Sequence, residues 1–273
     1  MEVLAFLAPP FAASLVLTGI HAYLGLHVVE RGVIFVDLAM AQVAALGATV
    51  GILFGLDWHS SSAYWWSLGF TLLAAVVLTW TRTKDSRIPQ EAFIGIVYIV
   101  SAALAILIMS KAPQGTEHLR HMLVGNILTV TWWEVGKTAM LYAVIGFLHW
   151  FFRKQLLLIS LQPEKARVQH AHLRWWDLFF YVTFGFVVTS SVAIAGVLLV
   201  FSYLVVPSVC AMLFAEKTSA RLTLGWILGT LVSVVGVAMS FLIDLPTGAT
   251  IVVTFGVCLL VCLLIKQLLF SAK

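Results

Sequence analysis

The amino-acid sequence predicts an all-α membrane protein, a polytopic bundle of about nine membrane-spanning helices. Two observations predict this fold class. Of the 273 residues, 62% are hydrophobic and only 10% are charged, so the chain has too little polar surface to face water. The charged residues also fall between apolar runs of about 20 residues, the length that an α-helix needs to cross the hydrocarbon of a bilayer. A membrane β-barrel would instead show short alternating strands.

Nine segments are long and apolar enough to cross the membrane, and a count of eight stays open. In chain order they are residues 3–27, 32–55, 62–81, 91–110, 134–152, 174–193, 196–215, 221–243 and 246–268. The connections between them are too short to hold a soluble domain. We therefore expect residues 1–273 to form one transmembrane domain.

Lysine and arginine are distributed unevenly between the two sides of the predicted bundle. With the amino terminus outside, thirteen of the 16 lie on the inner side, many of them in the loops 82–90 and 153–173. An excess of positive charge in cytoplasmic loops is the usual signature of membrane orientation. The net charge of +4 therefore indicates contact with a lipid membrane and gives no reason to expect a nucleic-acid partner.

Two connections contain more than turn residues. The outer segment 111–133 includes an apolar stretch, 122–130, that is too short to cross the membrane. It predicts a short re-entrant or interfacial helix near 118–130. In the inner loop, Pro163 precedes residues that can form a helix, and proline suits a helix's first turn. The alternative for this loop is a solvated connector.

The sequence shows no motif of an enzyme. Gly136-Lys137-Thr138 resembles the end of a phosphate-binding loop, but Thr131 stands where that loop needs its first glycine. No carboxylate pair and no nucleophile beside a base stand out. We therefore expect neither a catalytic site nor a cofactor.

Polar side chains inside the spans are the better indication of function. A charged group in mid-bilayer costs about 3 kcal/mol, so it should face a cavity or a partner. His21, Asp37 and Glu91 share the inner half of the predicted bundle, and Gln42 lies deeper in the second span. An imidazole and two carboxylates suit a divalent cation, which predicts a metal path. The alternative is structural: Glu91 caps a helix end and His21 is a hydrogen-bonded core residue.

A second candidate site is the pair His118 and His121, which share a face of any helix because they are three residues apart. At the outer mouth they are placed to receive a cation, although a neighbouring arginine opposes one. The alternative is a solvated polar patch. The three cysteines, Cys210, Cys258 and Cys262, all fall in predicted spans and are expected to be small core residues.

Five stretches between residues 91 and 252, in the same order as in the family, resemble the zinc/manganese/iron permease family of ABC transporters. They are Glu91-Ala-Phe-Ile-Gly-Ile-Val-Tyr98, Leu123-Val-Gly-Asn-Ile-Leu128, Leu156-Leu-Leu-Ile-Ser160 with Pro163-Glu164-Lys165-Ala166, Gly196-Val-Leu-Leu-Val200 with Pro207-Ser-Val-Cys-Ala211, and Ser240 with Asp244-Leu-Pro-Thr-Gly-Ala249 and Ile251-Val252.

The resemblance implies the membrane-spanning permease subunit of an ATP-driven importer of divalent metal ions (zinc, manganese or ferrous iron) in the plasma (inner) membrane of a bacterium or archaeon. It implies that two copies, as a homodimer, form the translocation path by alternating access. A separate cytoplasmic ABC ATPase would dock near Pro163, Glu164 and Ala166, and an extracytoplasmic binding protein would deliver the metal, which is cargo and not a cofactor.

One departure from the family concerns the second span. The family usually places Asp and His four residues apart on one helical face, and that pair is linked to metal passage. Here Ala41 stands four residues after Asp37 and Gln42 five after it, and aligning Gln42 with the histidine puts Leu38 at the aspartate position. Both alignments lose the imidazole, and we hypothesise that His21 on the neighbouring span replaces it.

Two other classes of function stay open on the sequence. One is a secondary transporter driven by an ion gradient. The other is a haem-binding redox subunit of the membrane, for which His21, His27 and His149 are the candidate ligands.

Overall fold

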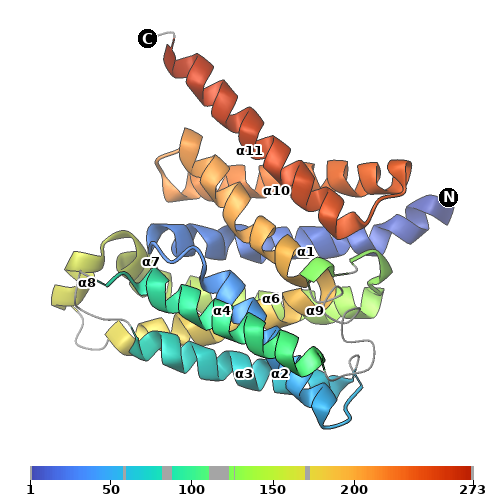
Figure 1. Cartoon of the computed structure of the whole chain (residues 1–273). Helices are drawn as coiled ribbons and strands as arrows, with labels where there is room; N and C mark the ends of the chain where they lie inside the picture. Colours follow the sequence, from blue (N-terminus) through green and yellow to red (C-terminus); the bar gives the residue numbers. More distant parts are fainter. Residues whose placement is uncertain are drawn as a thin grey trace.

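The computed structural model describes residues 2–57, 60–81, 88–110, 123–125, 127–169 and 173–271, and within these ranges its regular elements are all helices (Figure 1). The long helices are α1 (Glu2–Glu30), α2 (Val36–Leu53), α3 (Ser61–Trp80), α4 (Gln90–Met109), α6 (Trp132–Phe151), α9 (Leu173–Phe214), α10 (Thr218–Ile243) and α11 (Thr247–Ser271). The predicted fold class, an all-α membrane bundle, is confirmed.

Within the described ranges, seven helices are long and apolar enough to cross a membrane, and an eighth span results if α6 and the short helix α7 (Arg153–Leu161), bent by 76°, are counted together. Helix α9 counts once in this total, although its 42 residues are twice the length of one crossing. Gly196 breaks α9, because its φ of 74° is not helical. The two halves correspond to the predicted spans 174–193 and 196–215, so all nine predicted spans are helical.

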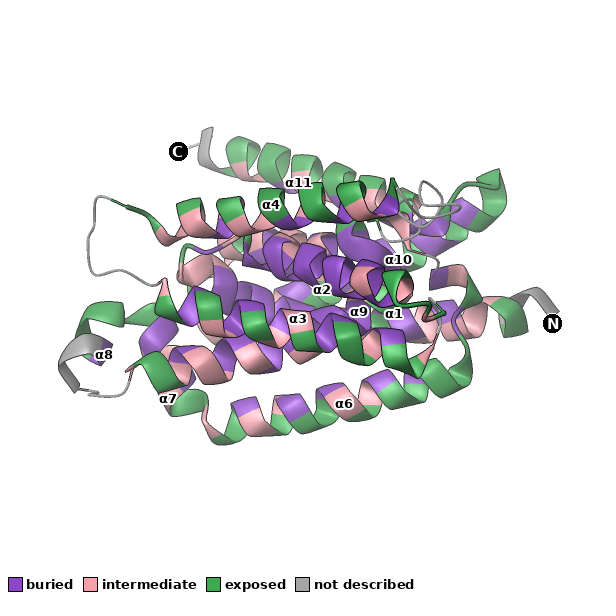
Figure 2. Cartoon of the chain, turned by 60° about the horizontal axis from the view of Figure 1, so that its bottom comes forward, coloured by how far each residue is buried: buried purple, intermediate pink, exposed green. Residues whose placement is uncertain are grey.

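Helix α2 lies in the middle of the bundle, where it packs against α3, α4 and α9. In its membrane-spanning window 78% of the residues are buried, compared with 22% in α4 and in α11 (Figure 2). Helix α1 packs against α9, α10 and α6 on the other side of α9. The outer faces of α4 and α11 carry exposed apolar side chains, as expected for surfaces that face lipid or another membrane subunit.

Three segments that are far apart in sequence meet at the break in α9. The chain at 123–125 passes so close to the break that Gly125 contacts the backbone of Ala195, while Val124 contacts Gly248 at the start of α11. The 3₁₀ turn η1 (Ile127–Thr129) follows. This turn and the helical residues 123 and 124 are what the described residues show of the helix predicted near 118–130. Residues 118–122 and 126 lie outside the described part.

The end of the bundle near the carboxyl end of α6 is closed by α7 and α8 (Pro163–Gln169) (Figure 1). The predicted helix that starts at Pro163 is confirmed. Helix α7 was not predicted, because its charged first residues resemble a loop. Its Leu156 and Ile159 are nonetheless buried, and burial of this apolar face fixes α7 against α1 and α9.

Candidate functional site

Asp37 is the clearest functional feature of the described residues. It lies in the first turn of α2 and is completely buried. Neither of its carboxylate oxygens has a hydrogen-bond partner among the described residues. The helix dipole of α2 favours a negative charge at this position, but a buried and unpaired carboxylate is otherwise costly. Asp37 is thus buried in the part of the bundle where α2 packs against α3, α4 and α9.

His21 of α1 is part of a buried polar chain that reaches Tyr142 of α6 (Trp132–Phe151). Its Nδ1 lies 2.8 Å from the Leu17 carbonyl oxygen and must donate a proton to it, which leaves the lone pair on Nε2. That Nε2 lies 3.2 Å from Ser191 Oγ. Ser191 is hydrogen-bonded to the Tyr142 hydroxyl, which also lies 3.2 Å from Ser190 Oγ. A metal ion on His21 would therefore displace Ser191 from the ring.

Glu91 and Gln42 lie on either side of the Asp37 turn. Glu91 Oε1 accepts a hydrogen bond of 3.4 Å from the backbone N–H of Phe35, the residue that precedes α2. Glu91 thus contacts the start of α2, while its own position is in the first turn of α4, the helix end that the end-cap alternative concerned. Gln42 is buried one and a half turns further along α2 and points about 140° away around the helix. His118 and His121 lie outside the described residues.

A second buried polar network lies nearer to α7. Arg31 forms an ion pair of 3.1 Å with Asp177, and the two side chains are 5% and 2% exposed. Arg31 Nε donates to Ser160 Oγ at 2.8 Å, and His27 Nδ1 lies at 2.8 Å from the same oxygen. The guanidinium also stacks 4.0 Å over the Phe180 ring. This network ties α1, α7 and α9 together.

His149 of α6 has one nitrogen without a partner. His149 Nε2 lies 2.8 Å from Thr183 Oγ1, whose hydroxyl is also within hydrogen-bond distance of backbone carbonyls of α9. The other ring nitrogen, Nδ1, is buried and has no hydrogen-bond partner among the described residues, and the same is true of the Tyr23 hydroxyl. The Tyr23 ring packs edge-on against both His149 and His27, at 5.6 and 4.8 Å between centroids.

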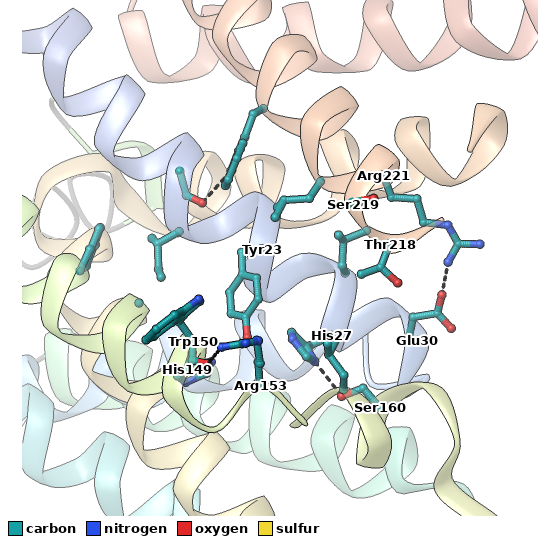
Figure 3. A pocket seen from close by; sticks show the side chains of 18 of the residues that line it. Tyr23, His27, Glu30, His149, Trp150, Arg153, Ser160, Thr218, Ser219 and Arg221 are labelled. Atoms are coloured by element: carbon teal, nitrogen blue, oxygen red, sulfur yellow. Dashed lines mark hydrogen bonds and ion pairs between the residues drawn. The ribbon is translucent and has the colours of Figure 1, made fainter. Parts of the chain in front are cut away.

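These unpartnered groups line a cavity of about 590 Å³ between α1, α6, α7 and α10. Its walls are mostly apolar, and its polar lining is grouped at one end (Figure 3): Tyr23, His27, Glu30, His149, Arg153, Ser160, Thr218, Ser219 and Arg221. His21, Asp37, Gln42 and Glu91 do not line it. Among the described metal candidates, His21 is linked to the cavity through Ser191 and Tyr142, which lines it. Asp37, Gln42 and Glu91 are separate from the cavity.

The residues predicted to dock an ATPase are all in α8. Pro163 and Glu164 are exposed, whereas Ala166 is completely buried. The exposed pair is therefore accessible to a partner, and Ala166 instead supports the packing of α8.

Sequence reasoning did not identify Tyr142, Ser190 and Ser191 as part of the site. Hydroxyl side chains are frequent in membrane helices, so nothing in the local sequence marks these three. Only a pattern of several polar residues on one face of α9, at Thr183, Ser190 and Ser191, could have indicated a buried polar surface.

Comparison with known proteins extends over nearly the whole chain. The model of the ABC 3 transport family matches residues 3–266. The manganese transport system membrane protein MntC of Listeria monocytogenes is 26% identical over 272 residues, which cover 98% of this chain and 95% of MntC. The high-affinity zinc uptake system membrane protein ZnuB of Buchnera aphidicola is 26% identical over 96% of this chain and 98% of ZnuB.

A solved structure has the same fold. The structure of PsaBC from Streptococcus pneumoniae in complex with a Fab superposes with a TM-score of 0.79 at 25% identity, over 96% of this chain and 93% of that one. The helices, the break in α9 and the full-length match lead to one assignment: the chain belongs to the ABC 3 transport family of membrane permeases.

Proposed function

We propose that this chain is the membrane-spanning permease of an ATP-driven importer of divalent metal ions, and that Asp37 is on the path of the ion. The observation that carries the proposal is the completely buried carboxylate whose two oxygens have no hydrogen-bond partner in the described structure. A divalent cation that passes the first turn of α2 would neutralise this charge. Relatives of nearly equal length are manganese and zinc transport proteins.

The donor atoms of α2 favour a hard cation. Asp37 offers oxygen ligands, which suit manganese better than zinc, whereas zinc prefers nitrogen and sulfur. Gln42, about 140° away around α2, would be a separate oxygen donor further along the path. We therefore rank manganese first, ferrous iron second and zinc third. A contribution from His21 would shift this order toward zinc or iron, because imidazole is a good ligand for both.

The partners follow from membership of the family. ATP would be hydrolysed by a separate ATPase that contacts α8 through Pro163 and Glu164, and an extracytoplasmic protein would deliver the metal. We propose that two copies of the chain enclose the path in a bacterial plasma membrane. Alternating access then requires that ATP binding change the relative affinity of the two orientations for the ion.

The test is metal uptake and metal-stimulated ATP hydrolysis by the complete complex in vesicles, measured with manganese, iron and zinc in turn. Asp37→Asn is expected to lower uptake at least tenfold, because the amide keeps the shape and loses the charge. Asp57→Asn, in the exposed segment that follows the end of α2, is the matched control. Normal uptake by Asp37→Asn would remove Asp37 from the path. Uptake with an ATPase that cannot hydrolyse ATP would instead support a gradient-driven transporter.

A further inference from the structure

The three cysteines of the chain come together in the folded structure. Cys210 is near the end of α9, and Cys258 and Cys262 occupy one face of α11, one turn apart. Their three sulfur atoms lie within 4.8 Å of one another. Cys210 is fully buried and Cys262 is 6% exposed. We call Cys210, Cys258 and Cys262 the thiol trio.

Sulfur spacing of this kind is close to what a trigonal metal site needs. A zinc–sulfur bond of about 2.3 Å places three sulfurs in a plane about 4.0 Å apart. Rotation about χ1 of each cysteine can bring the sulfur atoms from the observed spacing to the spacing of a trigonal site. The i, i+4 spacing on α11 fixes two ligands on one face of a helix, and α9, which packs against α11, supplies the third.

The chemistry of the thiol trio differs from that of the Asp37 turn. Thiolates are soft ligands that select ions such as Zn²⁺ and Cu⁺, whereas manganese prefers oxygen. We propose that the thiol trio is a binding site for a thiophilic d¹⁰ cation, distinct from the Asp37 path. Three cysteines that serve only as small apolar core residues have no need to converge from two helices.

The charge balance of binding is compatible with an apolar location. A divalent ion held by three thiolates releases three protons and leaves one net negative charge, so the ion offsets most of the charge that burial penalises. The site also has a route to water. Cys210 is four residues before the end of α9 and Cys262 is four residues before Lys266, the only charged residue of α11. Both distances are about 6 Å along a helix.

An ion in this position would join α11 to the second half of α9. Because it would bind the folded protein only, it should stabilise the fold by an amount that grows with the logarithm of one plus its concentration over its dissociation constant, and so raise the unfolding temperature. Binding is measured without transport, so the result does not depend on the proposed function.

The experiment uses the complete complex, reduced with a phosphine, and Cd²⁺ as the spectroscopic probe. We expect a thiolate-to-cadmium ultraviolet absorption at one ion per chain, release of three protons per ion, and displacement by Zn²⁺ but not by Mn²⁺. The difference spectrum against C210S/C258S/C262S isolates the trio from any cysteine of the partner subunits. Each single serine variant should weaken binding at least tenfold.

A second readout needs no variant. Bound Cd²⁺ should protect all three thiols of the native chain from maleimide, as counted by mass spectrometry of its peptides. Unchanged maleimide reaction together with no charge-transfer band would overturn the proposal. The same holds if the band persists in the triple variant, or if mild oxidation joins Cys210 to an α11 cysteine while the reduced protein binds no Cd²⁺.

Discussion

Gly125 and Gly196 meet backbone to backbone, with no room for a side chain on either. A Cβ on Gly125 would stand 2.1 Å from the Ala195 carbonyl carbon, and a Cβ on Gly196 would stand 2.3 Å from the Gly125 nitrogen. Both residues have positive φ, 66° and 74°, a conformation that glycine adopts at no steric cost. The break in α9 is therefore fixed by two glycines that lie 71 positions apart in the chain.

Gly196→Ala should therefore destabilise the protein strongly. The positive φ alone costs about 1–3 kcal/mol for a residue with a side chain, and the clash with the 123–125 segment adds to it. The measurement is the thermal unfolding midpoint of the purified protein in detergent. Gly256→Ala in α11 is the control, since a Cβ there meets no atom within 4 Å, and it should leave the midpoint unchanged or higher. Similar midpoints for the two variants would contradict the prediction.

Asp37→Asn should make the protein more stable while it lowers transport. Removal of a charge that has no hydrogen-bond partner in the described structure relieves a desolvation penalty, and we expect a gain of about 1 kcal/mol or more in the free energy of unfolding. Thermal unfolding of the metal-free protein tests this, with Asp57→Asn alongside. A lower midpoint for Asp37→Asn would mean that the carboxylate stabilises the fold.

The sequence predicted the spans well because span length is a local property. Each apolar run must reach across the same thickness of hydrocarbon, and no knowledge of neighbours is needed. The burial of Asp37 was equally predictable from the cost of a charge in the membrane. By contrast, the partners of His21 come from α6 and α9, and the hydroxyls of Tyr142 and Ser191 differ in no local way from other hydroxyls in the spans. Helix α7 was missed because its burial depends on α1 and α9.

The Arg31–Asp177 pair should contribute more to stability than the Arg221–Glu30 pair. The first pair is 5% and 2% exposed and the second is 19% and 24% exposed. Arg31→Ala leaves a buried charge and should cost about 3–5 kcal/mol, whereas Glu30→Gln should cost about 1 kcal/mol or less. Denaturant unfolding measures both.

Replacement of both charged residues tests whether Arg31 stabilises the fold through its ion pair with Asp177 or through its other contacts. Arg31→Met combined with Asp177→Leu should recover much of the loss, because a buried ion pair can often be replaced by apolar groups of similar size. A double variant as unstable as Arg31→Ala would show that Arg31 acts through its bond to Ser160 and not through Asp177.

His21→Ala should lower metal uptake at least tenfold if the ring takes the place of the missing family histidine. Ser191→Ala removes the hydroxyl that lies 3.2 Å from Nε2 but keeps the ring, so it should retain uptake. Both are measured below the unfolding temperature of the variants. Unchanged uptake in His21→Ala would leave the ring with its structural role only.

Glu164→Lys should weaken binding of the ATPase at least tenfold, because it reverses the charge of an exposed side chain in the first turn of α8. The affinity of the purified permease for its ATPase is the measurement. Glu216→Lys makes the same change at an exposed position between α9 and α10 and is the control. Equal loss in both variants would indicate a general charge effect and no defined docking surface.

The contact of Val124 with Gly248 can form only late in biosynthesis, after α11 has been made. The 123–125 segment enters the membrane long before the start of α11 leaves the ribosome, and domains are made from the amino terminus onward. Until α11 inserts, the 123–125 segment beside the break in α9 lacks its packing contact with Gly248. The start of α11 thus completes the packing around the break in α9, and a chain without α11 would leave the 123–125 segment without its contact at Gly248.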